Sequence, residues 1–128
     1  MLAVDTNIDV RYLTGDDALQ ARRARTLVDN NRVFVATTVV LESEWVLRSY
    51  RLTRERILEQ LGGFIRLPTV TMEHPMRVSK SLAWAVAGMD FADALHLVRA
   101  RDCNAFVSFD QRLARVANRL SGTRVQTP

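Results

Sequence analysis

Short runs of apolar residues alternate along the chain with longer segments in which apolar residues recur every three or four positions. Residues 1–4 and 33–36 are continuous apolar runs, and residues 105–109 form a similar run interrupted only by Ser108. Runs of this length are typical of strands buried on both faces of a parallel sheet. Residues 67–72 form a weaker run, in which Pro68 marks a strand start or edge, and residues 123–126 predict a short edge strand.

The segments between these runs have the periodicity of helices with one apolar face. We expect a short helical turn closed by Thr14–Gly15 and a helix that begins after Asp16 or Asp17. Further helices are expected at about 39–50, from Thr53 to a stop at Gly62–Gly63, from Pro75 to Gly88 and at about 90–101, and the last helix ends at Gly122. Strands that alternate with helices predict an α/β fold, with a parallel sheet of about five short strands flanked by helices.

Length and composition favour one domain over residues 1–128. With 48% hydrophobic residues the chain can bury a core of its own. No apolar stretch approaches the roughly 18 residues of a membrane helix, and no signal peptide is visible. Cys103, the single cysteine, excludes an internal disulfide and a cysteine-rich zinc site. We therefore expect a cytoplasmic protein that does not enter a membrane.

The charge favours a polyanionic partner. The net charge is +4, and all 18 basic residues except Lys80 are Arg, whose planar fork suits phosphate. Arg usage can equally reflect genome composition, and clusters such as Arg22, Arg23 and Arg25 can simply be solvated helix faces. If four of the 14 acids gathered in one pocket, the rest of the surface would carry a net +8.

Several acids stand where strands end or helices begin. Asp5 and Asp110 each follow a predicted strand directly, and Asp90 and Asp93 lie at a predicted helix start. Ligands of open α/β sheets gather outside the carboxyl ends of the strands, so these acids can meet at one edge. Each of them can instead be a helix N-cap, and Asp90 with Asp93 resembles a capping box.

Glu42 interrupts a mostly apolar stripe, since Val39 and Val46 share its helix face. A buried carboxylate is costly unless it is paired or bound to a metal. Glu44 is placed in much the same way, and the pattern does not separate the two glutamates. Four clustered carboxylates would repel one another unless hard cations lay between them, and oxygen-only ligands suit Mg²⁺ or Mn²⁺. Such a pocket is suited to phosphodiester cleavage.

The acids lie in four segments that match a known family in order. The chain resembles the PIN-domain nucleases and, within them, the VapC-type toxins of bacterial toxin–antitoxin systems. The matching segments are Val4–Asn7, Leu41–Leu47, Asp90–His96 and Val107–Asp110. The resemblance implies a Rossmann-like PIN fold and Mg²⁺- or Mn²⁺-dependent endoribonuclease activity. It also implies inhibition by a VapB-type antitoxin and a homodimeric toxin.

Carried over by position, the resemblance assigns Asp5, Glu42, Asp93 and Asp110 to the family's acidic quartet. Asp5, Asp93 and Asp110 would hold metal, and Glu42 would orient or deprotonate the attacking water. The glutamate three residues before Trp-Val-Leu is the family's, which selects Glu42 over Glu44.

Three more residues belong to this assignment. Asp90 is a possible additional acid that would share the role of Asp93. Thr6 and Asn7 would support the first aspartate of the quartet.

Other functions remain open. The alternative is a catalytically inactive PIN-like module that binds RNA or protein. An aspartate-phosphorylating phosphatase or receiver fits poorly, because position 7 is Asn and Asp9 comes two residues too late. Trp45 and Trp84 are expected in the core rather than as stacking platforms for bases. The first helical hairpin and helix 39–50, with Trp45 and Leu47, are the candidate groove for a protein partner.

Overall fold

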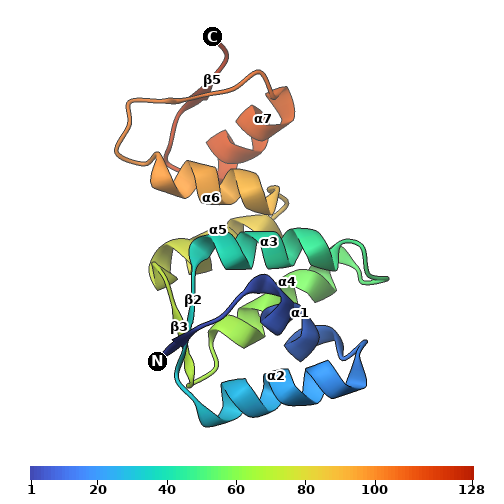
Figure 1. The fold of residues 1–128 in the computed structure, drawn as a ribbon. Helices are drawn as coiled ribbons and strands as arrows, with labels where there is room; N and C mark the ends of the chain where they lie inside the picture. The colour runs from blue at the N-terminus through green and yellow to red at the C-terminus, as the bar shows by residue number, and fades with distance from the viewer. The chain divides into compact units, whose positions relative to one another are not determined.

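The computed structural model describes every residue from Met1 to Pro128. The elements in chain order are β1 Leu2–Ala3, α1 Thr6–Thr14, α2 Ala18–Asn30, β2 Val33–Val35, α3 Thr37–Leu47, α4 Arg54–Ile65, β3 Val70–Met72, α5 Pro75–Val86, α6 Phe91–Arg99, β4 Phe106–Val107, α7 Gln111–Leu120 and β5 Val125–Gln126 (Figure 1). The chain forms two compact units, Met1–Pro75 and Met76–Pro128. No helix is both long enough and apolar enough to cross a membrane.

The first unit contains a three-stranded parallel sheet in the order β1-β2-β3 (Figure 1). The central strand β2 is the most buried, since Val33 and Val35 are both fully inaccessible. Helix α1 contacts α2, α3 and α4. Five parallel strands flanked by helices confirm the predicted α/β class, although the five strands pair as three plus two rather than in one sheet.

The expectation that the first strand is buried on both faces is wrong. Leu2 is 47% exposed, and Ala3 is also exposed. The reason is that β1 is an edge strand, paired within the sheet with β2 alone. An apolar run shows that a segment favours extended structure, but it does not show how many neighbours cover that segment.

Helix ends in the first unit follow their capping residues in most cases. Asp17 caps α2 by accepting a hydrogen bond from the Gln20 N–H, and Thr53 caps α4 through the Arg56 N–H. Gly15 ends α1 with φ +66°, a left-handed conformation that glycine adopts without strain.

The predicted stop of α4 at Gly62–Gly63 is wrong. The helix runs through both glycines to Ile65. Phe64 and Ile65 are buried on the apolar face of the last turn, and their burial outweighs the roughly 1 kcal/mol helix penalty of each glycine. Gly62 is itself buried, and a Cβ there would lie 3.0 Å from Nη1 of Arg66.

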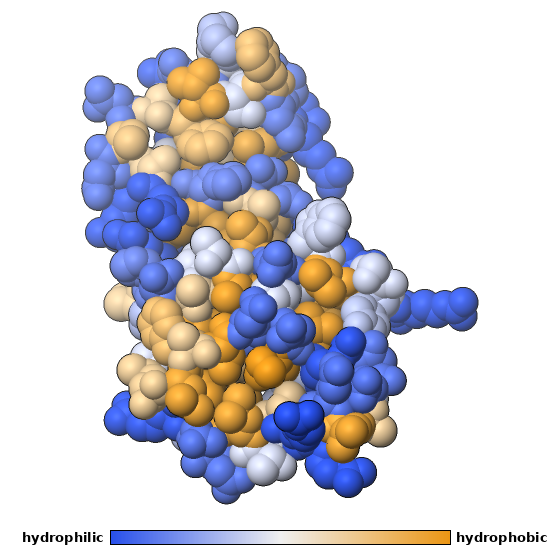
Figure 2. Space-filling model, in the orientation of Figure 1, coloured by the Kyte–Doolittle hydropathy of each residue, from blue (hydrophilic) through white to orange (hydrophobic).

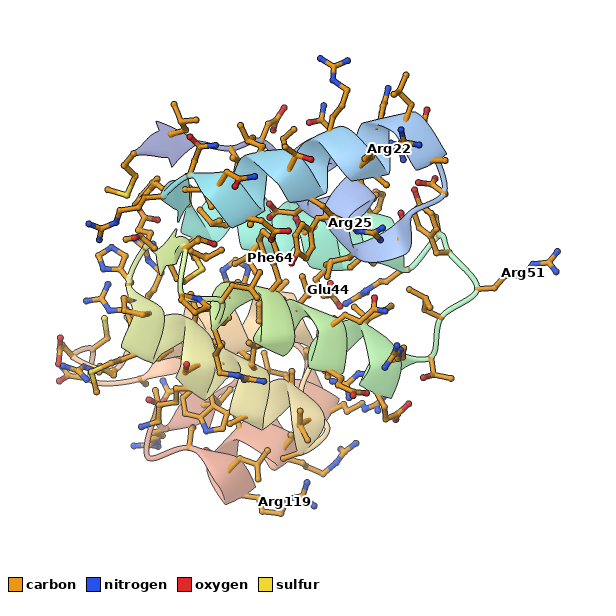
Figure 3. All side chains as sticks on the ribbon, turned by 90° about the horizontal axis from the view of Figure 1, so that it is seen from below. Arg22, Arg25, Glu44, Arg51, Phe64 and Arg119 are labelled. Carbon is orange, nitrogen blue, oxygen red and sulfur yellow. The ribbon has the colours of Figure 1, made fainter.

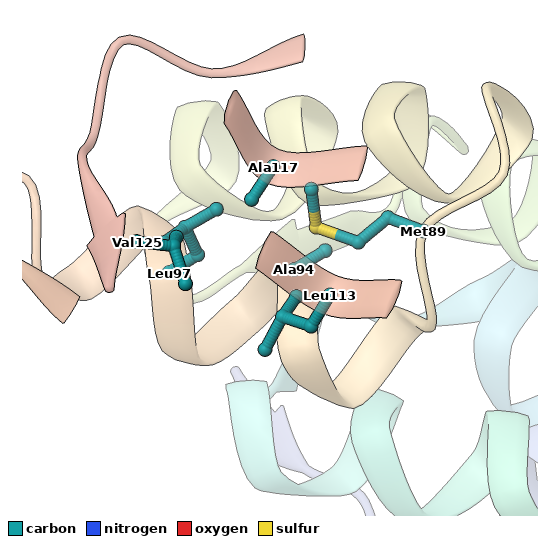
Figure 4. Close-up of a cluster of buried hydrophobic side chains, with 6 residues drawn as sticks. All are labelled: Met89, Ala94, Leu97, Leu113, Ala117 and Val125. Atoms are coloured by element: carbon teal, nitrogen blue, oxygen red, sulfur yellow. The ribbon is translucent and has the colours of Figure 1, made fainter. Parts of the chain in front are cut away.

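The second unit contains α6, α7, most of α5 and a two-stranded parallel sheet of β4 and β5. Its core is a cluster of buried side chains from α6, α7, β5 and the turn before α6 (Figure 4): Met89, Ala94, Leu97, Leu113, Ala117 and Val125. The predicted buried strand 105–109 is shorter and more exposed than expected, because β4 pairs with β5 alone in this sheet. Val107 is 53% exposed and Phe109 is 82% exposed.

The two tryptophans differ in how far they are buried. Trp84 is half-buried against the second unit's core, as predicted, and Nζ of Lys80 lies 5.6 Å from its ring centroid. Trp45 is 69% exposed on α3, so its predicted place in the core is wrong. Leu47, two residues later, takes the core position and is fully buried.

Candidate active site

Asp5 stands between the end of β1 and the start of α1. Its Oδ1 accepts a hydrogen bond of 2.7 Å from the Thr6 N–H, and the residue is the N-cap of the helix. The positive end of the helix dipole favours the negative charge there. Asp5 is exposed, so a carboxylate held in place by the backbone faces solvent.

Thr6 joins Asp5 to Glu42. The buried hydroxyl of Thr6 donates a hydrogen bond to Oε1 of Glu42 on α3. The backbone N–H and the side chain of one residue therefore hold two carboxylates that are 37 positions apart in sequence. The first unit thus brings together Asp5, Thr6 and Glu42. Asn7 makes no hydrogen bond to Asp5, and it lines a hollow between α1 and α2.

The structure separates the two glutamates that the sequence pattern left open. Glu44 is the buried one, 5% exposed, and its Oε1 lies 2.8 Å from Nη2 of Arg48 (Figure 3). Glu42 is exposed, so it is the solvated one of the two glutamates. Glu44 is neutralised within its own helix, whereas Glu42 has no ion pair.

The second unit brings together Asp90, Asp93 and Asp110. Asp90 caps α6 by accepting a 3.1 Å hydrogen bond from the Asp93 N–H. Asp110 caps α7 through the Leu113 N–H at 2.9 Å. Partial burial raises the pKa of Asp93, the charges of Asp90 and Asp110 raise it further, and the charge of His96 opposes them. A group of acids whose mutual repulsion raises a pKa is typical of functional sites.

Capping and a chemical role are compatible at these positions. Asp5, Asp90 and Asp110 each cap a helix with Oδ1. A carboxylate has two oxygens, so at Asp5 and Asp110 the cap leaves Oδ2 for a cation or a water molecule. Moreover, none of Asp5, Glu42, Asp93 and Asp110 forms an ion pair, in a chain with 18 basic residues.

The donors suit a hard cation. Neither unit by itself brings three His, Cys, Asp or Glu side chains close enough to hold a metal ion. The acids of each unit offer oxygen ligands only, which Mg²⁺ and Mn²⁺ prefer. The raised pKa of Asp93 also fits, because it comes first from burial and then from repulsion by Asp90 and Asp110, which a cation would relieve.

Asp9 is a residue that the sequence analysis did not single out as functional. It is fully buried on α1, its Oδ1 has no hydrogen-bond partner, and its Oδ2 lies 3.2 Å from Oγ of Ser43. Burial raises its pKa to about 7, Ser43 opposes the shift, and the charge of Asp5 adds to it. The signal was present in the sequence, since Asp9 stands between the apolar residues Ile8 and Val10.

Comparison with known proteins identifies the family. A model of the PIN domain matches residues 2–119, which includes all the acids described above and parts of both units. A comparison with curated proteins finds no match. PIN domains are generally nucleases that use divalent metals, and the domain suggests RNA binding. The match covers most of the sequence, and the chain belongs to the PIN-domain family.

Proposed function

We propose that this chain is a Mg²⁺- or Mn²⁺-dependent endoribonuclease that serves as the toxin of a toxin–antitoxin pair. The observation that carries the proposal is the placement of two unpaired carboxylates, Asp5 and Glu42, on the two hydrogen-bonding groups of Thr6. The acids Asp93 and Asp110 in the second half of the family match support it.

Each acid has its own role in this proposal. Asp5 and Asp93 would hold the main metal ion, and Asp110 would help to hold a second where one binds. The metal, when bound, stabilises negative charge on the phosphoryl oxygens. Glu42 accepts the proton of the attacking water, and the Thr6 hydroxyl orients its carboxylate.

The first prediction is that cleavage requires a divalent cation. The purified chain should cut a labelled RNA in Mg²⁺ or Mn²⁺ and stop when EDTA is added, because the proposed metal ligands are oxygen donors. Gel electrophoresis of the products is the measurement, and activity should return when excess Mg²⁺ is restored. Cleavage at an unchanged rate in chelator would refute the metal mechanism. Binding of RNA without cleavage in either metal would favour the inactive binding module.

The second prediction concerns the proposed VapB-type antitoxin, encoded next to this chain. Exposed apolar side chains on the first unit, among them Leu19 and Trp45, offer a partner an apolar surface. Figure 2 shows apolar residues gathered over this part of the chain. A hollow of about 380 Å³ between α1 and α2, lined by apolar residues such as Ile8 and Leu27 and by polar ones such as Arg11, supports the hairpin part of the proposed groove. Leu47 is fully buried and takes no part.

An Arg or Lys of that partner should approach Asp5, Glu42 or Asp93. Glu42→Gln should then weaken the complex by about 10- to 100-fold, the loss expected for one charge-assisted hydrogen bond. Calorimetric titration measures this, and Glu55→Gln, an exposed glutamate on α4, is the matched control. Equal affinities of both variants would refute insertion of a basic residue at these acids.

Ultracentrifugation of the free toxin tests the proposed homodimer.

A further inference from the structure

The net positive charge of the protein comes from its second unit. Residues 76–128 contain eight basic and four acidic side chains, whereas residues 1–75 contain ten of each. The net charge of +4 therefore comes entirely from the second unit. A polyanion would be attracted to that unit more strongly than to the first.

Helix α7 concentrates this charge on one face. Arg112, Arg115 and Arg119 follow one another at spacings of three and four residues, so they lie on the same side of the helix. The opposite side is the buried one, occupied by Leu113 and Ala117. We call the three arginines the α7 arginine face.

The α7 arginine face is open to solvent. All three side chains are exposed, none has a hydrogen bond or ion pair, and Arg119 points away from the helices in Figure 3. With the half-buried Val116 they line a shallow hollow of about 360 Å³.

An ordinary solvated helix face does not explain this arrangement. Like charges three or four residues apart destabilise a helix by about 0.2–0.5 kcal/mol per pair. Helix α4 relieves this cost with interspersed acids, and Nη1 of Arg56 lies 3.4 Å from Oε2 of Glu59. Helix α7 contains no acid between Gln111 and Leu120. Its three unrelieved charges are better explained by an anion that neutralises them.

We propose that the α7 arginine face binds the phosphate backbone of an RNA strand. This inference rests on the proposed function, because Asp110, one of the proposed site acids, caps the same helix. The rise of an α-helix spaces the arginines about 4.5 and 6 Å apart along its axis, so they contact a short stretch of one strand. Arginine pairs with phosphate in two-point geometry. Phosphate contacts fix the register of the RNA and contribute affinity, but they do not read its sequence.

The test is the salt dependence of RNA binding without cleavage. Fluorescence anisotropy of a labelled single-stranded RNA is measured in EDTA at salt concentrations from about 0.05 to 0.5 M. The variant replaces Arg112, Arg115 and Arg119 by Gln. Each lost contact should reduce the magnitude of the slope of log K against log salt by about 0.7. The slope of the triple variant should therefore be smaller in magnitude by about 2. That loss corresponds to about 100-fold weaker binding near 0.1 M salt.

A matched control removes three charges elsewhere. Arg22, Arg32 and Arg51 are exposed, belong to the first unit and have no hydrogen bond or ion pair, so their replacement by Gln changes net charge equally. The control should keep the wild-type slope. Circular dichroism should show both triple variants folded, because all six side chains lie at the surface.

Each outcome decides the inference. An unchanged slope in the α7 variant, or an equal loss in the control, overturns it. The same holds if the α7 variant loses binding to an acidic protein partner but keeps its RNA affinity. Wild-type protein that binds RNA through these arginines but does not cleave it with Mg²⁺ refutes the proposed function and leaves this inference standing. Wild-type protein that does not bind RNA overturns both.

Discussion

Replacing Asp5 or Asp93 with Asn is expected to abolish RNA cleavage while the protein remains folded. We expect the rate to fall by about 10³-fold or more, because each change removes a proposed ligand of the main metal ion. Asn is as good a helix N-cap as Asp, so Asp5→Asn keeps the start of α1. Asp93→Asn relieves the repulsion from Asp90 and Asp110 and should leave stability unchanged or raised.

Asp17→Asn is the matched control for these variants. Asp17 also caps a helix, α2, but it is not one of the proposed site acids. Cleavage rates and thermal unfolding curves of the three variants are compared with those of the wild type. Unfolding of both Asp5→Asn and Asp93→Asn would support a purely structural role. Full activity in either folded variant would remove that residue from the proposed site.

Replacing Asp9 with Asn is expected to raise the free energy of unfolding at about pH 8 but not at about pH 4. Burial raises the pKa of Asp9 from 3.8 to about 7 in the folded protein. Between these values the folded state binds the proton and the unfolded state does not, so stability falls as the pH rises. Above about pH 7 the loss is complete and amounts to a cost on the order of 4 kcal/mol, part of which Asn recovers.

Urea unfolding of the wild type and of Asp9→Asn in EDTA over this pH range measures the effect. The difference in unfolding free energy should grow from about pH 4 to about pH 7 and then stay constant. Asp29→Asn, an exposed change on α2, should show no such growth. A difference between wild type and Asp9→Asn that does not depend on pH would mean that the Asp9 carboxyl does not titrate in this way.

The local sequence pattern correctly predicted those features of the fold that depend on a few neighbouring residues. The positive φ of Gly15 ends α1 as expected, and β2, with Val33 and Val35 fully buried, follows its apolar run. The apolar runs of β1 and β4 predicted buried strands, but both strands are more exposed, because burial of a strand depends on neighbours that are distant in sequence. The stop at Gly62–Gly63 failed because the buried residues after it hold the helix together.

The sequence showed acids at strand ends and helix starts, and the family resemblance then selected the candidate site from among them. The pattern could not rank Glu42 and Glu44, although Arg48 stands four residues after Glu44, at the spacing of a helical ion pair. Asp9 was missed because its effect comes from desolvation by elements that pack around α1. Trp45 was misplaced because its periodicity is shared with buried neighbours on α3.

The hydroxyl of Ser43 has one proton and two acceptors within reach. Its Oγ lies 2.8 Å from the carbonyl oxygen of Val39 and 3.2 Å from Oδ2 of Asp9. The hydroxyl donates to one of these acceptors at a time, and its bond to Oδ2 of Asp9 opposes the rise in the pKa of that carboxyl. Once Asp9 ionises, the hydroxyl can satisfy only one of the two oxygens. The protonation of Asp9 therefore decides whether the Ser43 hydroxyl stays bonded to the carbonyl oxygen of Val39. This carbonyl belongs to the first turn of α3, one turn before Glu42.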